Sequence, residues 1–172
     1  MNTIEQELQD QVLQLMRDKR TDQLTGLGNY LAFREYIGNL RKLGCGFSVV
    51  LIDMTNLKAA NEQLGHFGAD ALLAKVGSKI RGHDHVFRHG GDEFAVVLPG
   101  CPLGGAISVR NRIELDVGLD WLENGMPICA VASACQVTPD VDLDGQLNRC
   151  DNALEERKVG IKRDLVRVHT CG

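Results

Sequence analysis

The chain has 172 residues, of which 44% are hydrophobic and 24% are charged, and its formal net charge is −4. This length and composition suit one globular domain with a hydrophobic core and exclude a disordered chain. The acidic balance argues against nucleic-acid binding through a broad basic surface. No apolar run approaches the roughly 20 residues of a membrane span, so we expect no membrane segment.

The cysteines and the first residues indicate a compartment. Six cysteines are scattered along the chain without a CxxC pair, and the polar, acidic start MNTIEQELQD is unlike a signal peptide. These features are typical of reduced thiols in a cytoplasmic protein, and they disfavour a zinc site.

The first predicted element is a helix over residues 1–20 with apolar side chains along one side. Ile4, Leu8 and Leu15 fit a heptad, but polar residues occupy two of its other core positions, which makes the stripe weak for a coiled coil. Two interpretations stay open: a helix docked on its own domain, or a stub for signalling or dimer formation. We treat it as a helical stub in front of one domain over 21–172.

Helical and strand patterns alternate after a turn-rich stretch at 21–29. The predicted helices cover 29–42, 56–63, 69–81, 104–117 and 143–158. The predicted strands cover 45–54, 85–89, 93–99 and 127–138, and the run DLVRVH favours a final strand at 164–169. GHFGAD at 65–70 predicts a turn between two helices. Together these elements predict an α+β domain.

Three carboxylates are expected at one edge of the sheet. Asp53 ends a buried strand, and Asp92 and Glu93 begin the strand after the hairpin RHGGDEF. If the strands are neighbours, these like charges need a cation, and oxygen ligands without a His or Cys cluster suit Mg²⁺. Gly90 and Gly91 permit a positive φ in the turn and leave room for a ligand near the backbone. The alternative is an ordinary hairpin turn with exposed acids.

Four ordered segments resemble the GGDEF family of diguanylate cyclases. The motif itself is intact at 90–94, and DQLTGLGN at 22–29, DMTNLKAANEQLGHFGAD at 53–70 and RGHD at 81–84 are similar to other family segments. The resemblance implies a ferredoxin-like fold similar to the palm of nucleotide polymerases and nucleotidyl cyclases, a largely antiparallel sheet flanked by helices. It also implies that two domains, each holding one GTP, form cyclic di-GMP and two pyrophosphates as a transient homodimer.

The resemblance implies a role for each matching residue. Asp53 and Asp92 hold Mg²⁺ or Mn²⁺ with the Met54 backbone carbonyl, and Glu93 is either a second metal ligand or the base for the 3′-hydroxyl proton. The substrate-binding set comprises Lys58, Asn61, Asp70, Gly90, Gly91, Lys158 and Lys162. In this set the amide and the carboxylate read the guanine edge, and the lysines neutralise the triphosphate.

Simpler roles exist for several of these residues when each is taken singly. Asn61 is also suited to capping the end of its helix, and Asp70 to an N-cap. A lone lysine is usually a solvated surface charge. For RxxD, the resemblance implies that Arg81 and Asp84 bind a dimer of the product and inhibit the enzyme. A guanidinium suits this role, because it can pair with phosphate or guanine in a bidentate way. The alternative for that motif is an intramolecular ion pair at a helix end.

The chain also departs from the family pattern, at Tyr30, Thr55, Leu57, Glu62, Ala69, Glu155, Arg157 and Ile161. None of these replaces a residue assigned to metal or base, but the late ones bear on the phosphate-binding lysines. The sequence therefore predicts an active, product-inhibited cyclase, with a cyclic di-GMP receptor without turnover as the alternative. A cyclase with an adenine-containing product is disfavoured, because the Asp70 carboxylate fits the donors of guanine.

Overall fold

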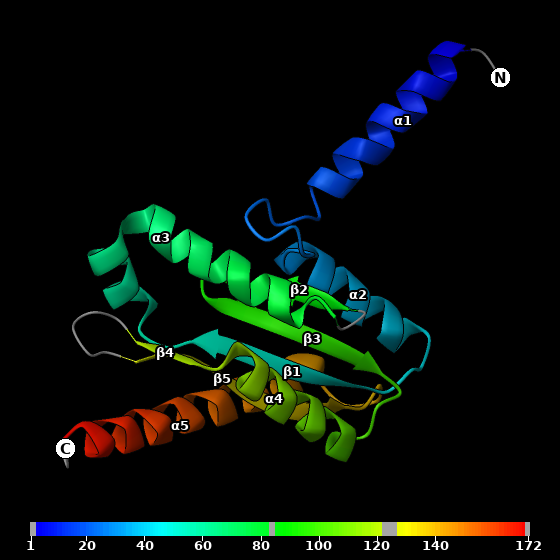
Figure 1. The fold of residues 1–172 in the computed structure, drawn as a ribbon. Coiled ribbons are helices and arrows are strands. Elements are labelled where there is room, and N and C mark those ends of the chain that lie inside the picture. Colours follow the sequence, from blue (N-terminus) through cyan, green and yellow to red (C-terminus); the bar gives the residue numbers. More distant parts are fainter. Residues whose placement is uncertain (1–2, 83–84, 122–126, 171–172) are drawn as a thin grey trace.

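The computed structural model describes residues 3–82, 85–121 and 127–170 (Figure 1). Its helices are α1 Thr3–Asp18, α2 Tyr30–Lys42, α3 Leu57–Ile80, α4 Leu103–Val117 and α5 Leu143–Thr170. Its strands are β1 Phe47–Met54, β2 Val86–Arg88, β3 Glu93–Pro99, β4 Leu119–Trp121 and β5 Pro127–Val137. The predicted α+β class with an antiparallel sheet is confirmed, and the short β4 is an addition that the sequence patterns did not indicate.

One five-stranded sheet runs in the order β2-β3-β1-β5-β4, with every neighbouring pair antiparallel. The central strand β1 is buried along its whole length. Because side chains alternate along a strand, Val50, Ile52 and Met54 enter one apolar cluster, while Val49 and Leu51 enter another. Burial on both faces explains why this strand reads as a continuous apolar run.

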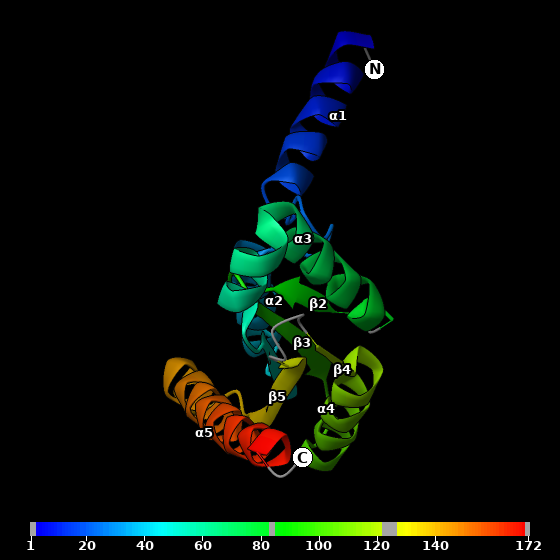
Figure 2. The same cartoon turned by 60° about the vertical axis from the view of Figure 1, so that its left-hand side comes forward.

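Helices cover both faces of the sheet (Figure 2). Leu73 of α3 and Ile113 of α4 pack with the first of these clusters. Phe33 of α2 and Leu154 of α5 pack with the second. The sheet therefore lies between two helical layers, and the candidate site forms at the ends of its strands.

One sequence-based prediction is wrong, and another is confirmed only in part. Residues 164–169 continue α5 instead of forming a final strand, because β-branched residues only weakly oppose a helix that has already begun. The predicted turn at 65–70 is reduced to one break at Gly65 (φ 70°, ψ 173°), and α3 continues on both sides of it. Glycine adopts this positive φ without the Cβ clash that other residues meet.

Residues 21–29, called the connecting segment below, join α1 to α2 and are attached to the sheet. Gly28 forms an isolated bridge with Phe87, and its carbonyl accepts from the Arg88 N–H at 2.7 Å. The Asn29 side chain then caps α2 by accepting from the Ala32 N–H at 3.1 Å. The position of this segment is therefore tied to β2, the strand that leads into the GGDEF turn.

Helix α1 extends away from the rest of the protein (Figure 1). Its apolar side chains lie in solvent, with Ile4 69%, Leu8 60% and Leu15 68% exposed. The helix is therefore not docked on its own domain. Within the described part of the chain, no helix combines the length and the apolar character needed to cross a membrane.

Candidate active site

The carboxylates predicted to share one edge of the sheet do so. Asp53, at the end of β1, lies directly opposite Glu93, at the start of β3. The turn before β3 is joined to the same edge, because the Met54 N–H donates to the Asp92 carbonyl at 3.1 Å. The expectation that these two strands are neighbours is confirmed, and it places three acidic residues at one strand end.

Asp53 is the most enclosed of these acids, with 4% of the residue exposed. Burial raises the pKa of Asp53 to about 6, the nearby Lys158 acts in the opposite direction, and the charges of Asp92 and Glu93 add to the increase. Lys158 of α5 reaches the carboxylate with Nζ 3.0 Å from Oδ2, and the same Nζ lies 2.8 Å from Glu155 Oε1. α5 therefore supplies the counter-charge for the end of β1.

The loop between β1 and α3 shapes the adjoining pocket. The buried Thr55 hydroxyl accepts from the Cys129 N–H at 3.0 Å and lies 3.2 Å from the Cys129 carbonyl, which fixes the loop to β5. Asn56 then takes a left-handed conformation (φ 57°), which asparagine tolerates better than most residues. Thr55, one of the departures from the family pattern, thus has a structural role here.

An open pocket of about 230 Å³ is lined by this loop, Asp53, Asp92, Lys58 and Lys158. Among the residues that the structure describes, no three His, Cys, Asp or Glu side chains converge into a ready-made metal cage. Two carboxylates beside two lysines nevertheless fit Mg²⁺, which typically takes one or two carboxylates together with substrate phosphates. The donor set is therefore compatible with a metal that arrives with a phosphate ligand.

The turn residues differ from the sequence-based interpretation in one respect. Neither Gly90 nor Gly91 has a positive φ, so the turn does not need glycine for that reason. A Cβ at Gly90 would instead overlap the carboxylate of Glu93, whereas a Cβ at Gly91 would meet nothing within 4 Å. Gly90 therefore makes room for Glu93, whose Oε2 lies 3.6 Å from Nδ1 of His89.

The candidate guanine-reading residues lie on α3, on either side of its break. Asn61 donates to the Leu57 carbonyl at 3.2 Å, and its Oδ1 lies 3.2 Å from Nδ1 of His66. Asp70 is exposed inside the helix, so neither residue is a helix cap. Their simpler alternatives as caps are therefore wrong.

For two other predicted residues the structure describes no side chain. Lys162 lies on α5, one turn beyond Lys158, but its side chain is outside the described part. Asp84 of the RxxD motif also lies outside the described residues. Arg81 follows α3 and donates through Nη2 to the carbonyl of Thr25 in the connecting segment.

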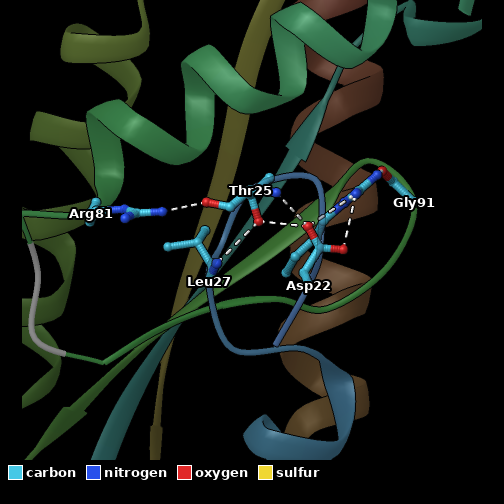
Figure 3. A network of polar contacts seen from close by, with 6 residues as sticks. Asp22, Thr25, Leu27, Arg81 and Gly91 are labelled. Atoms are coloured by element: carbon cyan, nitrogen blue, oxygen red, sulfur yellow. Dashed lines mark hydrogen bonds and ion pairs between the residues drawn. The ribbon is translucent and has the colours of Figure 1, made fainter. Parts of the chain in front are cut away.

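A polar network joins the connecting segment to the turn (Figure 3). The family resemblance assigned no role to Asp22 or Arg88, whose side chains form this connection. Arg88 contacts the carboxylate of Asp22 at 3.1 Å and the carbonyl of Gly91 at 2.6 Å. Asp22 lies at the start of the matched segment DQLTGLGN, and Arg88 lies two residues before the matched GGDEF motif. Their positions in and beside the motifs were thus the available signal, but only the fold shows that they meet.

Comparison with known proteins gives a consistent picture. A sequence model of the family described as "Diguanylate cyclase, GGDEF domain" matches residues 19–159. The chain is 28% identical over 162 residues to diguanylate cyclase VdcA of Vibrio cholerae, which covers 88% of this chain and 48% of VdcA. It is 36% identical over 90 residues to diguanylate cyclase DosC of Escherichia coli, which covers 48% of this chain and 20% of DosC. The chain thus spans about half or less of the length of these relatives.

A solved structure shares the fold. The coiled coil and GGDEF domain of DgcB from Caulobacter crescentus, in complex with c-di-GMP, superimposes with a TM-score of 0.80 at 22% identity. The match covers 90% of this chain and 88% of the DgcB chain.

Proposed function

The chain belongs to the diguanylate cyclase family defined by the GGDEF domain, and on this premise we propose that it condenses two GTP molecules into cyclic di-GMP and two pyrophosphates. One observation carries the proposal: Asp53 faces Glu93 across two strands, beside a pocket that Asp92, Lys58 and Lys158 also line. Paired carboxylates next to lysines are the groups that phosphoryl transfer needs, since its catalysis is mainly positioning and charge neutralisation.

Each bond-forming step joins the two nucleotides in the same way. The 3′-hydroxyl oxygen of one GTP attacks the α-phosphorus of the other, the bond to the β-phosphate breaks, and pyrophosphate leaves. Asp53 and Asp92, with the Met54 carbonyl, would hold Mg²⁺ or Mn²⁺, which supplies positive charge for the phosphate oxygens when bound. Lys58 and Lys158 add charge from the protein.

Glu93 has two candidate roles in this step. Its side chain is 47% exposed and lies at the turn, so it can accept the 3′-hydroxyl proton or bind the metal. Both roles are proposed for Glu93, because it lies beside Asp53 and Asp92 at the same edge of the sheet. Asn61 and the exposed Asp70 present an amide and a carboxylate to the guanine edge, whose ring N–H and amino group are donors.

One domain holds half of the reactants. Two phosphodiester bonds must close a symmetric ring, and a two-fold pairing of identical domains is the simplest geometry for that. We therefore infer a transient homodimer around two GTP molecules, with residues 21–172 as the catalytic domain and residues 1–20 as a helical stub. The cytoplasm, where GTP is available, is the compartment in which we expect it to work. Product is expected to inhibit the reaction by binding at Arg81 and Asp84.

The decisive experiment identifies the products of GTP and Mg²⁺ incubated with the chain. We expect cyclic di-GMP and pyrophosphate in a ratio of one to two, and no mixed dinucleotide when ATP is added. Cyclic di-GMP that binds without any turnover would support the receptor alternative instead. Added cyclic di-GMP should slow the reaction less in Arg81→Ala than in the wild type.

Substitution of the turn acids tests the assignment of the site. Asp92→Asn and Glu93→Gln should each lower turnover roughly 100-fold or more, the range seen when one electrostatic catalytic group is removed. Because both side chains are partly exposed, neither change should alter the folded structure. Near-normal turnover in a folded variant, checked by circular dichroism, would contradict the assignment.

A further inference from the structure

Arg88 divides its guanidinium between the connecting segment and the GGDEF turn. Nη1 donates to the two carboxylate oxygens of Asp22 at 3.3 and 3.1 Å, while Nη2 and Nε donate to the Gly91 carbonyl at 2.6 and 3.3 Å. The Arg88 side chain is only 13% exposed, so water competes weakly for these donors. One side chain therefore holds the segment and the turn at a fixed separation.

The Gly91 carbonyl has a direct connection to the catalytic acids. It belongs to the same planar peptide unit as the Asp92 nitrogen. The next two carbonyls are held by backbone donors: Asp92 O accepts from the Met54 N–H at 3.1 Å, and Glu93 O accepts from two amides of the turn at 2.8 and 3.1 Å. Arg88 is the side chain that holds the first of these three consecutive carbonyls, and so it orients the peptide that carries Asp92.

Asp22 is itself held in place within the connecting segment. Its Oδ1 accepts from the Thr25 N–H at 2.9 Å and from the Thr25 hydroxyl at 2.7 Å. Burial alone would raise the pKa of Asp22, but these hydrogen bonds and the charge of Arg88 hold it below its ordinary value. The ionised carboxylate is thus a fixed acceptor for the arginine.

Thr25 also connects the segment to α3. Its carbonyl accepts from Arg81 Nη2, and Leu27 N–H donates to its hydroxyl at 3.4 Å (Figure 3). The helix packs closely on the same residue, since a Cβ at Gly77 would lie 3.1 Å from the Thr25 Cβ. An unbroken series of hydrogen bonds therefore leads from Arg81 through the connecting segment to the turn.

We propose that Asp22 and Arg88 are positioning residues for the cyclase reaction, and that a ligand held by Arg81 acts on the GGDEF turn through them. This inference rests on the proposed function, in which Arg81 binds product and the turn carries the catalytic acids. A ligand that draws the Arg81 guanidinium toward itself changes the hydrogen bond to Thr25, whose N–H and hydroxyl hold Asp22. The product then affects the site within a single domain, in addition to any contact between domains.

The kinetic test uses Arg88→Lys, which keeps the charge but loses the planar fork that spans two partners. We expect kcat to fall about tenfold while KM for GTP changes less than about twofold, because Arg88 contacts the turn rather than the pocket. Arg34→Lys is the matched control, since Arg34 forms an exposed ion pair with Asp144 at 2.9 Å. An unchanged kcat in Arg88→Lys, or a rise in KM alone, would overturn the positioning role.

The second test does not depend on turnover. In ¹⁵N-labelled protein without nucleotide, Arg88→Lys and Arg81→Ala should each shift the amide resonance of Asp92, and Arg81→Ala should add no further shift in an Asp22→Asn background. An Asp92 resonance unmoved by Arg81→Ala overturns the link to Arg81, and one unmoved by Arg88→Lys overturns the positioning role. If the wild type makes no cyclic di-GMP but these shifts are seen, the proposed function fails while the connection from Arg81 to the turn stands.

Discussion

Lys158 offsets the unfavourable burial of the Asp53 carboxylate near the end of β1. The strand carries the Asp53 carboxyl into the interior, where burial raises its pKa to about 6, and the ammonium of Lys158 opposes that increase. The lysine is 18% exposed and lies 3.0 Å from the carboxylate. A divalent cation held by Asp53 and Asp92 would supply this counter-charge when bound, and Lys158 would then be able to turn toward the triphosphate.

Removal of this lysine should therefore be felt before any nucleotide binds. Lys158→Met leaves Asp53 without its partner, and we expect a loss of about 1–3 kcal/mol in the free energy of unfolding at pH 7. Lys58→Met is the control: Lys58 lines the same pocket but is exposed, so its loss should stay within about 0.5 kcal/mol. Denaturant unfolding measures both, and equal stability of the two variants would argue against the Asp53 contact.

The Asp22–Arg88 contact predicts a pH-dependent contribution to stability. The folded-state pKa of Asp22 lies below its ordinary value of 3.8, so the carboxylate stabilises the fold above that pH and loses this effect as pH falls through the folded-state pKa. Asp22→Asn should cost about 1–2 kcal/mol at pH 7, since it removes a charged hydrogen-bonding partner. The cost should shrink toward zero as pH falls through the folded-state pKa.

The control for this pH profile is Asp144→Asn. Asp144 pairs with Arg34, but its side chain is 68% exposed, and such pairs contribute little. Unfolding curves recorded from pH 3 to pH 7 separate the two variants. A cost of Asp22→Asn that stays constant over this range would show that its charge is not what stabilises the connecting segment.

At the level of elements, the two glycines of the turn should not be equivalent. A Cβ at Gly90 overlaps the Glu93 carboxylate, whereas a Cβ at Gly91 enters open space. Gly90→Ala should therefore displace Glu93 and lower turnover about tenfold, by misplacing a proposed catalytic group. Gly91→Ala should leave Glu93 in place and keep stability within about 1 kcal/mol.

Side-chain NMR of Glu93 in the absence of nucleotide is the direct measurement for this pair. A loss of turnover in Gly91→Ala with Glu93 unmoved would indicate that a ligand approaches the backbone there, the second reason for glycine given by the sequence. Equal displacement of Glu93 in both variants would contradict the steric difference between the two positions.

Helix α5 explains two departures from the family pattern. Arg157 Nη2 contacts Glu114 of α4 at 2.8 and 2.9 Å, and Glu114 Oε1 also accepts from the Ala132 N–H of β5 at 2.8 Å. Glu155 holds the Nζ of Lys158 at 2.8 Å. These contacts hold α5 beside the sheet. Lys158 therefore stays at the candidate site although the sequence around it departs from the family pattern.

Secondary structure was predicted well wherever one hydrophobic periodicity dominated the sequence. The apolar run of β1 and the strands around Gly90 were predicted with small errors at their ends, because burial on a sheet face enforces the pattern. The last strand at 164–169 failed because a short β-branched run does not exclude a helix. The side-chain partners of Arg88 and Thr55 were beyond prediction, since residues far apart in the chain meet only after folding.

At the scale of the whole molecule, α1 extends away from the domain and leaves its apolar side chains exposed within the described part of the chain. Ile4, Leu8 and Leu15 stand in water, and exposed apolar stripes of this kind usually mark a binding surface. The heptad is incomplete, because Gln11 and Asp18 take core positions. Pairing through α1 alone is therefore expected to be weak, which agrees with a dimer that forms around GTP rather than a permanent one.

The proposed dimer mechanism makes activity depend on protein concentration. Because two domains must meet for each ring that is closed, activity per chain should rise with concentration and reach a plateau. Replacing Leu8 and Leu15 by serine should move the half-maximal point to a higher concentration, since it removes two apolar contacts from a two-fold helix pair. Leu115→Ser is the control, because Leu115 is 80% exposed but lies on α4. Light scattering and turnover measured over the same dilution series decide the matter: constant activity per chain in a protein that stays monomeric would rule out the two-domain mechanism.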